Sequence, residues 1–468
     1  MNYKEFLAAK GVAHAPTGIP DPPALNPMLK AHQPHCTRWA LQRGRSALFE
    51  ECGLGKTWQG LEWAHRVIRH TAKPVLVMTP LAVTGQWVTE ANKLWDEDCG
   101  PDGPIQIREE SDVEGDSASL YVCNYERLDR LSELLPLLGG VVLDESSILK
   151  AYDGKTRTKL IEAFQHVAFR LALTATPSPN DVTELGNHAE FLGAMSRVEM
   201  LATFFCHDGG DTSVWRLKGH AEKDFWAWVR TWAMCVSKPS DMGYSDDGYE
   251  LPPLELVEHV VDVDFRMARQ AGLLFAFEAS TLTEQRAVKR DTLAERVALA
   301  SELVNGTAGQ WLVFCDLNDE STALAKAIAG AVEVTGSDSA EDKERAILGF
   351  IAGESRVMVS KSSIVGFGLN LQCAHQIAFA GSDHSYERFH QAVRRCWRFG
   401  QRHPVQVHLF RTSADGRVAH NLERKRLEHE AMVRSLVAVT GGGGERRRIT
   451  GGTAELQLPS FMRELRSA

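Results

Sequence analysis

The feature that most constrains the fold is the run GLGKT at residues 53–57, because of the elements expected on either side of it. A short apolar strand at residues 47–49 precedes the run, and an amphipathic helix over residues 58–70 follows it. Glycines let the backbone amides turn toward an anion, and the amino end of a helix adds positive potential. The run therefore predicts a phosphate-binding loop in an α/β domain.

Apolar strand-like runs alternate with amphipathic helical stretches along most of the chain, as is typical of parallel α/β domains. In the first series we expect strands at residues 47–49, 74–79, 120–124, 140–143 and 169–174, and helices at 58–70, 86–95 and 156–164. A second series has expected strands at 310–315, 332–334, 357–360, 376–380 and 405–410. A chain of 468 residues is long for one core, so two α/β lobes with parallel sheets are predicted.

The expected domain limits follow from changes in composition along the chain. Residues 186–254 are rich in aromatics and end in the polar run at 237–253, which is typical of an interdomain crossing. We therefore expect a first lobe at 1–185, a helical insertion and crossing at 186–254, a second lobe at 255–440, and a Gly/Arg-rich tail at 441–468. A long charged helix is expected near residues 421–439.

Two carboxylates complete the predicted nucleotide site. Asp144 and Glu145 end an apolar strand, where an acidic pair can hold magnesium and polarise a water molecule. Lys56 is expected at the β/γ-phosphates and Thr57 at the magnesium ion. Alone, the loop could be a glycine-rich turn and the acidic pair a solvated strand end. Their order and separation favour a site for ATP and Mg²⁺, although Glu50 stands where a first glycine is usual.

Eight segments resemble the motifs of superfamily 2 helicases, most closely those of the Swi/Snf-like group. They are LKAHQ at 29–33, EECGLGKT at 50–57, MTPL at 78–81, LDESSILK at 143–150, LTATP at 173–177, WLVFCDLNDES at 311–321, GFGLNL at 366–371 and QAVRRCWRFGQ at 391–401. The resemblance covers residues 29–410. It implies two RecA-like lobes with an ATP cleft between them and a helical insertion after motif III. Departures from the family pattern are Glu50, Ser146-Ser147 and the stretch at 381–384.

The resemblance also implies roles for individual residues. Gln33 is expected to read the adenine, with Gly53, Gly55 and Gly368 at the nucleotide and Thr174 and Thr176 coupling the ATP side to the nucleic-acid side. Thr79, Pro80, Tyr125, Ser362 and Ser363 are the expected nucleic-acid contacts, with the alternative that each is only a loop or strand-end residue. Contacts of this kind touch phosphates without reading bases, so low sequence specificity is expected.

The spacing of two arginines in motif VI predicts a role that can be argued from helix geometry. Arg395 and Arg398 lie three residues apart, so both guanidinium groups can point the same way from a helix. From the second lobe they would neutralise charge that builds on the γ-phosphate, as arginine fingers do, and Gln391 would help to position the attacking water. The alternative is a basic stripe that faces solvent or DNA.

The aromatic stretch at 225–232 has two interpretations. Its rings could stack on bases or act as a strand-separating wedge, or they could form the core of the inserted element. A helical core for the inserted element is the preferred interpretation.

Composition excludes some classes of protein. The net charge of −9 excludes a uniformly basic surface but not a local basic groove. Nine scattered cysteines without a C-x-x-C pair favour reduced thiols and not a disulfide framework or a zinc ribbon. The first residues do not resemble a signal peptide, and no apolar stretch approaches the length of a membrane helix. A cytoplasmic protein is expected, and its compact form resembles stand-alone Swi/Snf-like helicases of phages and prophages.

Three functions compete at this stage. The leading hypothesis is a translocase on duplex DNA with DNA-stimulated ATPase activity, in phage or bacterial DNA replication, repair or recombination. The second is a helicase that separates strands of forked DNA or RNA. The third is an ATP-regulated binding protein that clamps DNA or a partner with little turnover, which the five intact residues of the predicted ATPase machinery disfavour.

Overall fold

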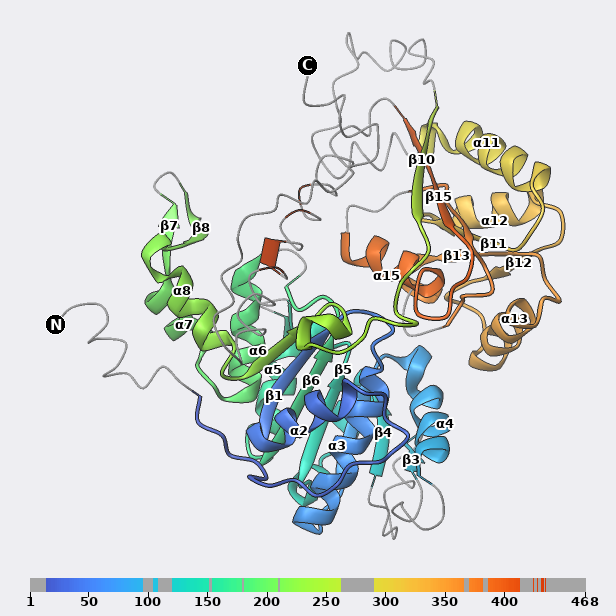
Figure 1. Ribbon diagram of the computed structural model, residues 1–468. Coiled ribbons are helices and arrows are strands. Elements are labelled where there is room, and N and C mark those ends of the chain that lie inside the picture. The colour runs from blue at the N-terminus through green and yellow to red at the C-terminus, as the bar shows by residue number, and fades with distance from the viewer. Residues whose placement is uncertain are drawn as a thin grey trace.

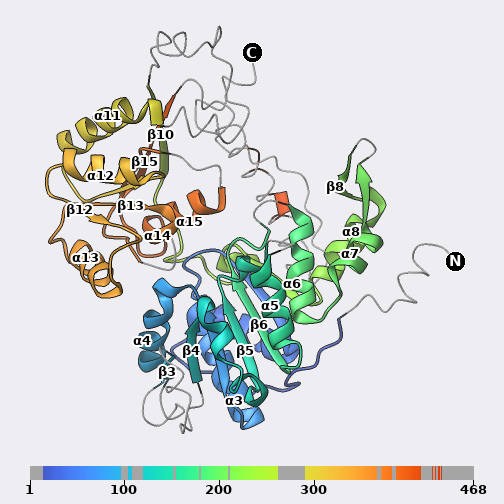
Figure 2. The same cartoon turned by 180° about the vertical axis from the view of Figure 1, so that it is seen from behind.

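The computed structural model describes residues 14–95, 104–107, 120–150, 154–178, 181–208, 211–261, 290–365, 370–381 and 386–412, and single positions between 424 and 434. Within these residues the chain forms two α/β lobes, each built on its own sheet (Figures 1 and 2). The predicted fold class is therefore confirmed.

The first sheet has seven parallel strands in the order β3-β4-β2-β5-β6-β1-β9. Their bounds are β1 (Arg45–Glu50), β2 (Val75–Thr79), β3 (Pro104–Gln106), β4 (Leu120–Asn124), β5 (Gly140–Asp144), β6 (Phe169–Thr174) and β9 (Ala233–Val236). We call this sheet and its helices the first lobe.

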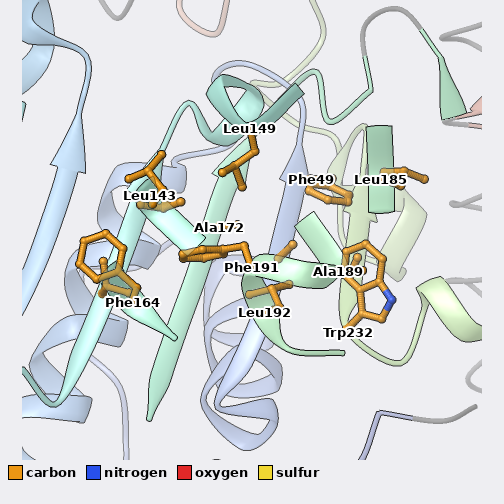
Figure 3. Close-up of a cluster of buried hydrophobic side chains, with 14 of the residues drawn as sticks. Phe49, Leu143, Leu149, Phe164, Ala172, Leu185, Ala189, Phe191, Leu192 and Trp232 are labelled. Atoms are coloured by element: carbon orange, nitrogen blue, oxygen red, sulfur yellow. The ribbon is translucent and has the colours of Figure 1, made fainter. Parts of the chain in front are cut away.

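Helices cover both faces of the first sheet because its strands are apolar on both faces. On β2, Leu76 and Met78 point into one core and Val75 and Val77 into the other. The second of these cores packs under α2 (Gln33–Arg43), α3 (Lys56–Thr71) and α4 (Thr84–Leu94). The first packs under α5 (Lys155–Phe164), α6 (Leu185–Leu192), α7 (Arg197–Phe204) and α8 (Glu222–Val229). Figure 3 shows this first core, which contains Phe49 and Leu143 of the sheet and Phe191 of α6.

The second sheet has six parallel strands in the order β10-β15-β14-β11-β13-β12. Its strands are β10 (Leu254–Val261), β11 (Trp311–Cys315), β12 (Ala331–Val334), β13 (Val357–Lys361), β14 (Gln376–Phe379) and β15 (Val405–Thr412). One core lies against α11 (Leu293–Gly306) and α12 (Asn318–Ala327), and the other against α13 (Ala340–Ala352), α14 (Ser362–Val365) and α15 (Tyr386–Cys396). This sheet with its helices is the second lobe, and α15 lies on the side of it that faces the first lobe (Figures 1 and 2).

The aromatic-rich segment is more varied than the predicted helical insertion. Besides α7 and α8 it contains an antiparallel hairpin of β7 (Phe205–Asp208) and β8 (Asp211–Leu217). It ends in β9, which pairs with β1 and so belongs to the first sheet. The aromatic side chains are core: Phe225, Trp228 and Trp232 are each at most 2% exposed. This confirms the core interpretation over a base-stacking surface or a wedge.

Residues 237–253 connect β9 of the first sheet to β10 of the second. The expected helix near 421–439 lies outside the described residues apart from single positions, and the tail at 441–468 lies wholly outside them. The connections contain short 3-10 helices, which are η1 (Leu81–Val83), η3 (Tyr125–Arg130), η4 (Leu135–Leu137), η5 (Ser146–Lys150), η6 (Val182–Glu184), η7 (Gly219–Ala221) and η8 (Pro239–Met242). Within the described part of the chain, no helix combines the length and the apolar character needed to cross a membrane.

Candidate nucleotide site

The predicted phosphate loop lies between β1 and α3, and α3 begins at Lys56. Gly53 and Gly55 have φ values of 92° and 90°, which side chains with a Cβ rarely adopt. A Cβ at Gly55 would lie 2.0 Å from Nε2 of Gln33. Both glycines are therefore required by the backbone path, and the loop has the curled form that a phosphate site needs.

Gln33 of α2 lies beside this loop. Its Nε2 donates to the carbonyl oxygen of Leu54 at 2.8 Å, and its Oε1 accepts from the backbone amide of Lys30 at 2.9 Å. His32 also lies at the same carbonyl, with Nε2 at 3.1 Å. Gln33 thus holds the backbone of the loop through a hydrogen bond to Leu54. Its predicted contact with adenine stays a prediction.

Lys56 folds back over the loop in this structure. Its Nζ donates to the carbonyl oxygens of Glu50 at 2.6 Å and of Glu51 at 3.3 Å. The Glu50 carboxylate is fully buried, accepts from Nε2 of Gln59 at 2.7 Å, and has its pKa raised by burial. The unusual Glu50 therefore points into the protein below the loop, which leaves the loop surface to the backbone amides. Thr57 is half-buried in the first turn of α3.

The acidic pair stands at the end of β5. Asp144 accepts through Oδ2 from Nε1 of Trp87 at 2.7 Å and through Oδ1 from the amide of Glu145 at 3.0 Å. Its carbonyl oxygen accepts from the Tyr125 hydroxyl at 2.6 Å. Burial, and then the charge of Glu145, raises the pKa of Asp144 to about 6. A nearby cation would relieve this cost.

The residues after Asp144 are held in an unusual local structure. Glu145 has φ of 49°, in the left-handed region that a residue with a side chain adopts only when its surroundings hold it there. Ser146, a departure from the family pattern, has its hydroxyl 3.1 Å from Nε2 of His188 on α6. Burial lowers the pKa of His188 to about 4, so this histidine is neutral near pH 7. Ser146, which departs from the family pattern, therefore has a hydrogen-bond partner in His188 on α6.

Motif VI lies on α15 and the turn after it, and it reaches the first lobe. Arg395 forms an ion pair with Glu145 (Nη2 to Oε1, 3.5 Å), and Gln391 donates from Nε2 to the Thr176 hydroxyl at 3.4 Å. The pKa of Arg398 is lowered by burial and then by Arg395. The structure therefore places Arg395 beside the carboxylate expected to act on water. Its predicted role as an arginine finger at the γ-phosphate stays a prediction.

Sequence reasoning missed four residues of the site, which are Lys30, Glu51, Arg394 and Phe399. Arg394 forms an ion pair with Glu51 at 2.9 Å, and a Cβ at Gly53 would lie 3.0 Å from Cβ of Phe399. The ammonium of Lys30 lies 3.5 Å from the centroid of the Phe399 ring. The basic run in motif VI was the signal available in the sequence, but it does not say which arginine meets which carboxylate.

The oxygen atoms of the site suit magnesium, which in proteins is held by one or two side-chain oxygens together with substrate phosphates. Asp144 and Thr57 offer a carboxylate and a hydroxyl of this kind. No cluster of three His, Cys, Asp or Glu side chains that could hold a metal ion occurs in the described ranges. The Asp144 carboxylate and the Thr57 hydroxyl therefore fit a magnesium ion whose other ligands would be phosphate oxygens and water.

The predicted nucleic-acid contacts lie in varied settings. Thr79 is fully buried and its hydroxyl is 2.9 Å from that of Thr84, and Tyr125 is also buried. Pro80 and Ser362 are half-buried, and Ser363 is exposed. The contact role of all five stays a prediction, and the burial of Thr79 and Tyr125 counts against side-chain contacts by these two.

The two predicted coupling residues are buried, with Thr174 at the end of β6 and Thr176 just after it. The Thr174 hydroxyl accepts from the amide of Thr176 at 3.1 Å. Thr176 also accepts a hydrogen bond from Gln391 of the second lobe, and the coupling role of the two threonines stays a prediction. Gly368 lies outside the described residues.

Comparison with known families gives two matches along the chain. An SNF2-related domain matches residues 32–204, and a helicase conserved C-terminal domain matches residues 295–400. The two matched segments follow one another along the chain, and they are similar to the two halves of a Swi/Snf-like helicase core. This pairing supports the resemblance to superfamily 2 helicases.

The curated relatives are similar over only part of their length. A SWI/SNF chromatin-remodeling complex subunit, snf22, of Schizosaccharomyces pombe is 26% identical over 36% of this chain and 11% of its own. An uncharacterized ATP-dependent helicase, YqhH, of Bacillus subtilis is 30% identical over 32% of this chain and 26% of its own. The chain thus matches about a quarter or less of each relative, and neither supports the expected link to phages.

A solved structure, the Sulfolobus solfataricus SWI2/SNF2 ATPase core in complex with dsDNA, is 18% identical to the chain. The similarity covers 90% of this chain and 96% of that one, with a TM-score of 0.43. A likeness of this size carries no conclusion about what this chain binds.

Proposed function

We propose that the chain is an ATP-dependent DNA translocase that couples ATP hydrolysis to movement on DNA. The observation that carries this proposal is the meeting of the two lobes at the predicted nucleotide site, where Arg395 of α15 pairs with Glu145 after β5. A nucleotide site built from both lobes makes their relative position depend on what the site holds.

The residues of the first lobe divide the chemistry between them. Lys56 would exchange its hydrogen bonds to the loop carbonyls for the β- and γ-phosphates of ATP. Thr57 and Asp144 would hold a magnesium ion. Magnesium-bound ATP supplies the phosphoanhydride bond whose cleavage drives the cycle. Glu145 accepts a hydrogen bond from the attacking water and polarises it. Trp87 and Tyr125, through their hydrogen bonds to Asp144, keep this carboxylate oriented toward the site.

The residues of the second lobe act on the γ-phosphate and on the attacking water. Arg395 and Arg398 neutralise the charge that develops on the transferred group, and Gln391 positions the water. When these contacts form or break, the second lobe shifts relative to the first, and the Gln391–Thr176 contact carries the shift to the segment after β6. Alternate gripping of DNA by the two lobes would turn this shift into movement.

The DNA path that we propose runs across the carboxyl ends of the two sheets. Pro80 follows β2 in the first lobe, and Ser362 and Ser363 follow β13 in the second. Such contacts hold the phosphate backbone and not the base edges, so we propose duplex DNA of any sequence as the substrate. A place in phage or bacterial DNA replication, repair or recombination, in the cytoplasm, belongs to the same proposal.

Displacement of a third strand tests translocation directly. A triplex-forming oligonucleotide is annealed to one end of a long duplex, and its release is followed with ATP present, with Glu145→Gln as the control. ATP-dependent release by the wild-type protein alone is expected. ATP hydrolysis at a normal rate with no release would contradict movement along the duplex.

The strand-separating alternative loses support from the structure, since the aromatic side chains once considered as a wedge are buried in the first lobe. ATP-dependent opening of a forked duplex without any triplex release would restore it. The third function, a binding switch with little turnover, would require ATP to change DNA affinity without sustained hydrolysis.

A further inference from the structure

The carboxylate of Glu51 joins the phosphate loop to the second lobe. Its Oε1 accepts from the backbone amide of Cys52 at 2.8 Å, and its Oε2 lies 2.9 Å from Nη2 of Arg394. The two side chains are 22% and 8% exposed. One carboxylate therefore fixes both the backbone of the loop and the helix that carries motif VI.

The contacts of Arg394 continue to the interdomain crossing. Its guanidinium lies 4.5 Å from the centroid of the Trp397 ring and donates from Nη1 to the Trp397 carbonyl at 3.4 Å. Nε1 of Trp397 in turn donates to the carbonyl oxygen of Pro252 at 2.7 Å. Pro252 lies two residues before β10 begins. A continuous set of polar contacts thus runs from the phosphate loop through motif VI to the crossing between the lobes.

Neighbouring arginines on α15 meet different carboxylates. Arg394 pairs with Glu51 of the phosphate loop, whereas Arg395 pairs with Glu145 at 3.5 Å. Removing charges from water costs energy, so a mostly buried ion pair is weak evidence of stabilisation for its own sake. Such a pair is better explained as fixing one arrangement of the parts that it joins, here the loop and α15.

We propose that Arg394 is a positioning residue, whose ion pair with Glu51 sets the second lobe in register with the phosphate loop so that Arg395 reaches the reacting phosphate. This inference rests on the proposed ATPase function for its catalytic consequence. Its structural consequence, the registration of the two lobes, does not depend on hydrolysis.

The test uses full-length protein and a matched control. Arg394→Gln removes the interlobe pair, while Arg157→Gln removes a pair of similar burial, Arg157–Glu190 at 2.5 Å, that lies within the first lobe. Donor and acceptor dyes are attached through unnatural amino acids at Leu137 and Leu348, which are 58% and 56% exposed and lie in different lobes. Single-molecule energy transfer without nucleotide then reports the interlobe distance.

We expect Arg394→Gln to broaden the distribution of interlobe distances, and Arg157→Gln to leave it as in the wild type. In ATPase assays Arg394→Gln should lower kcat about tenfold or more, with KM for ATP changed less, because misplacement of a catalytic group acts on the transition state. Arg394→Lys should retain part of the activity, because it keeps one charged donor. Melting temperatures establish that each variant folds.

Charge reversal makes the test specific to the pair. Glu51→Arg and Arg394→Glu each place like charges together, and the double variant restores opposite charges, so it should have a narrower distance distribution and a higher kcat than either single variant. A wild-type distance distribution in Arg394→Gln, an equal effect of Arg157→Gln, or a double variant no better than both singles would each overturn the inference. If the wild type hydrolyses no ATP, the proposed function fails while the distance measurement still decides the role of Arg394.

Discussion

At the scale of single residues, three hydrogen bonds hold Asp144 in the candidate nucleotide site. Trp87 and the amide of Glu145 each donate to one oxygen of its carboxylate, and Tyr125 donates to its carbonyl. Of these, Tyr125 was expected to touch nucleic acid. Its buried hydroxyl lies 2.6 Å from the Asp144 carbonyl oxygen. We therefore propose that Tyr125 places the acidic pair, while its contact with nucleic acid stays a prediction.

Replacing Tyr125 by Phe separates these two roles. The substitution removes one buried hydrogen bond, which costs about 1–2 kcal/mol, and loosens the backbone at Asp144. We expect kcat for ATP hydrolysis to fall several-fold while the Kd for duplex DNA, measured by fluorescence anisotropy, stays unchanged. Weaker DNA binding with an unaltered kcat would support the nucleic-acid role instead.

The glycines of the chain offer a matched pair of substitutions. Gly55→Ala places a Cβ on a residue with φ of 90°, 2.0 Å from Gln33, and should abolish binding of a fluorescent ATP analogue. Gly85→Ala adds a Cβ in α4 with nothing within 4 Å, and should raise stability by about 0.5–1 kcal/mol without affecting nucleotide binding. Normal analogue binding by Gly55→Ala would mean that the loop does not hold the phosphates.

The sequence predicts some site residues better than others for a physical reason. Lys56, Asp144 and Glu145 were identified because loop, strand and helix follow one another locally, and local order fixes where they point. The Glu51–Arg394 pair joins residues 343 positions apart on different lobes. Such a pair depends on how the two folded lobes pack against each other, and a local sequence pattern does not predict that packing.

At the scale of elements, the strands buried on both faces were the ones predicted well. β4 and β6 have the expected bounds because their continuous apolar runs are covered on both faces. β10 was missed because charged Glu255 and Glu258 interrupt it, as an edge strand allows. β9 was missed because the aromatics before it suggested helix, although its four residues are all buried beside β1.

The aromatic segment yields a prediction at this scale. Trp228 of α8 is 2% exposed and stacks on Phe204 at 5.4 Å. Trp228→Ala should therefore destabilise the first lobe by about 3–5 kcal/mol, seen as a lower melting temperature. Trp215, half-buried on β8, gives the comparison, since its replacement by Ala should have a smaller effect. An unchanged melting temperature, with loss of fork opening alone, would revive the wedge interpretation.

At the scale of the whole molecule, two parallel sheets are joined by the crossing at residues 237–253 and by the contacts of motif VI with the phosphate loop. The predicted two-lobe fold rests on the alternation of strands and helices, which each lobe contains by itself. The substrate that the two lobes bind together depends on the surface that both lobes form once they are folded. Nothing in a local pattern distinguishes duplex DNA from a single strand or from RNA.

Steady-state ATP hydrolysis with no nucleic acid, single-stranded DNA, duplex DNA and RNA tests the central claim most directly, with Glu145→Gln as the control. The account predicts strong stimulation by duplex DNA that the control variant lacks, because gripping the duplex brings the second lobe and Arg395 to the phosphate. Hydrolysis that no nucleic acid stimulates would contradict a DNA-driven motor and leave a switch controlled by another partner.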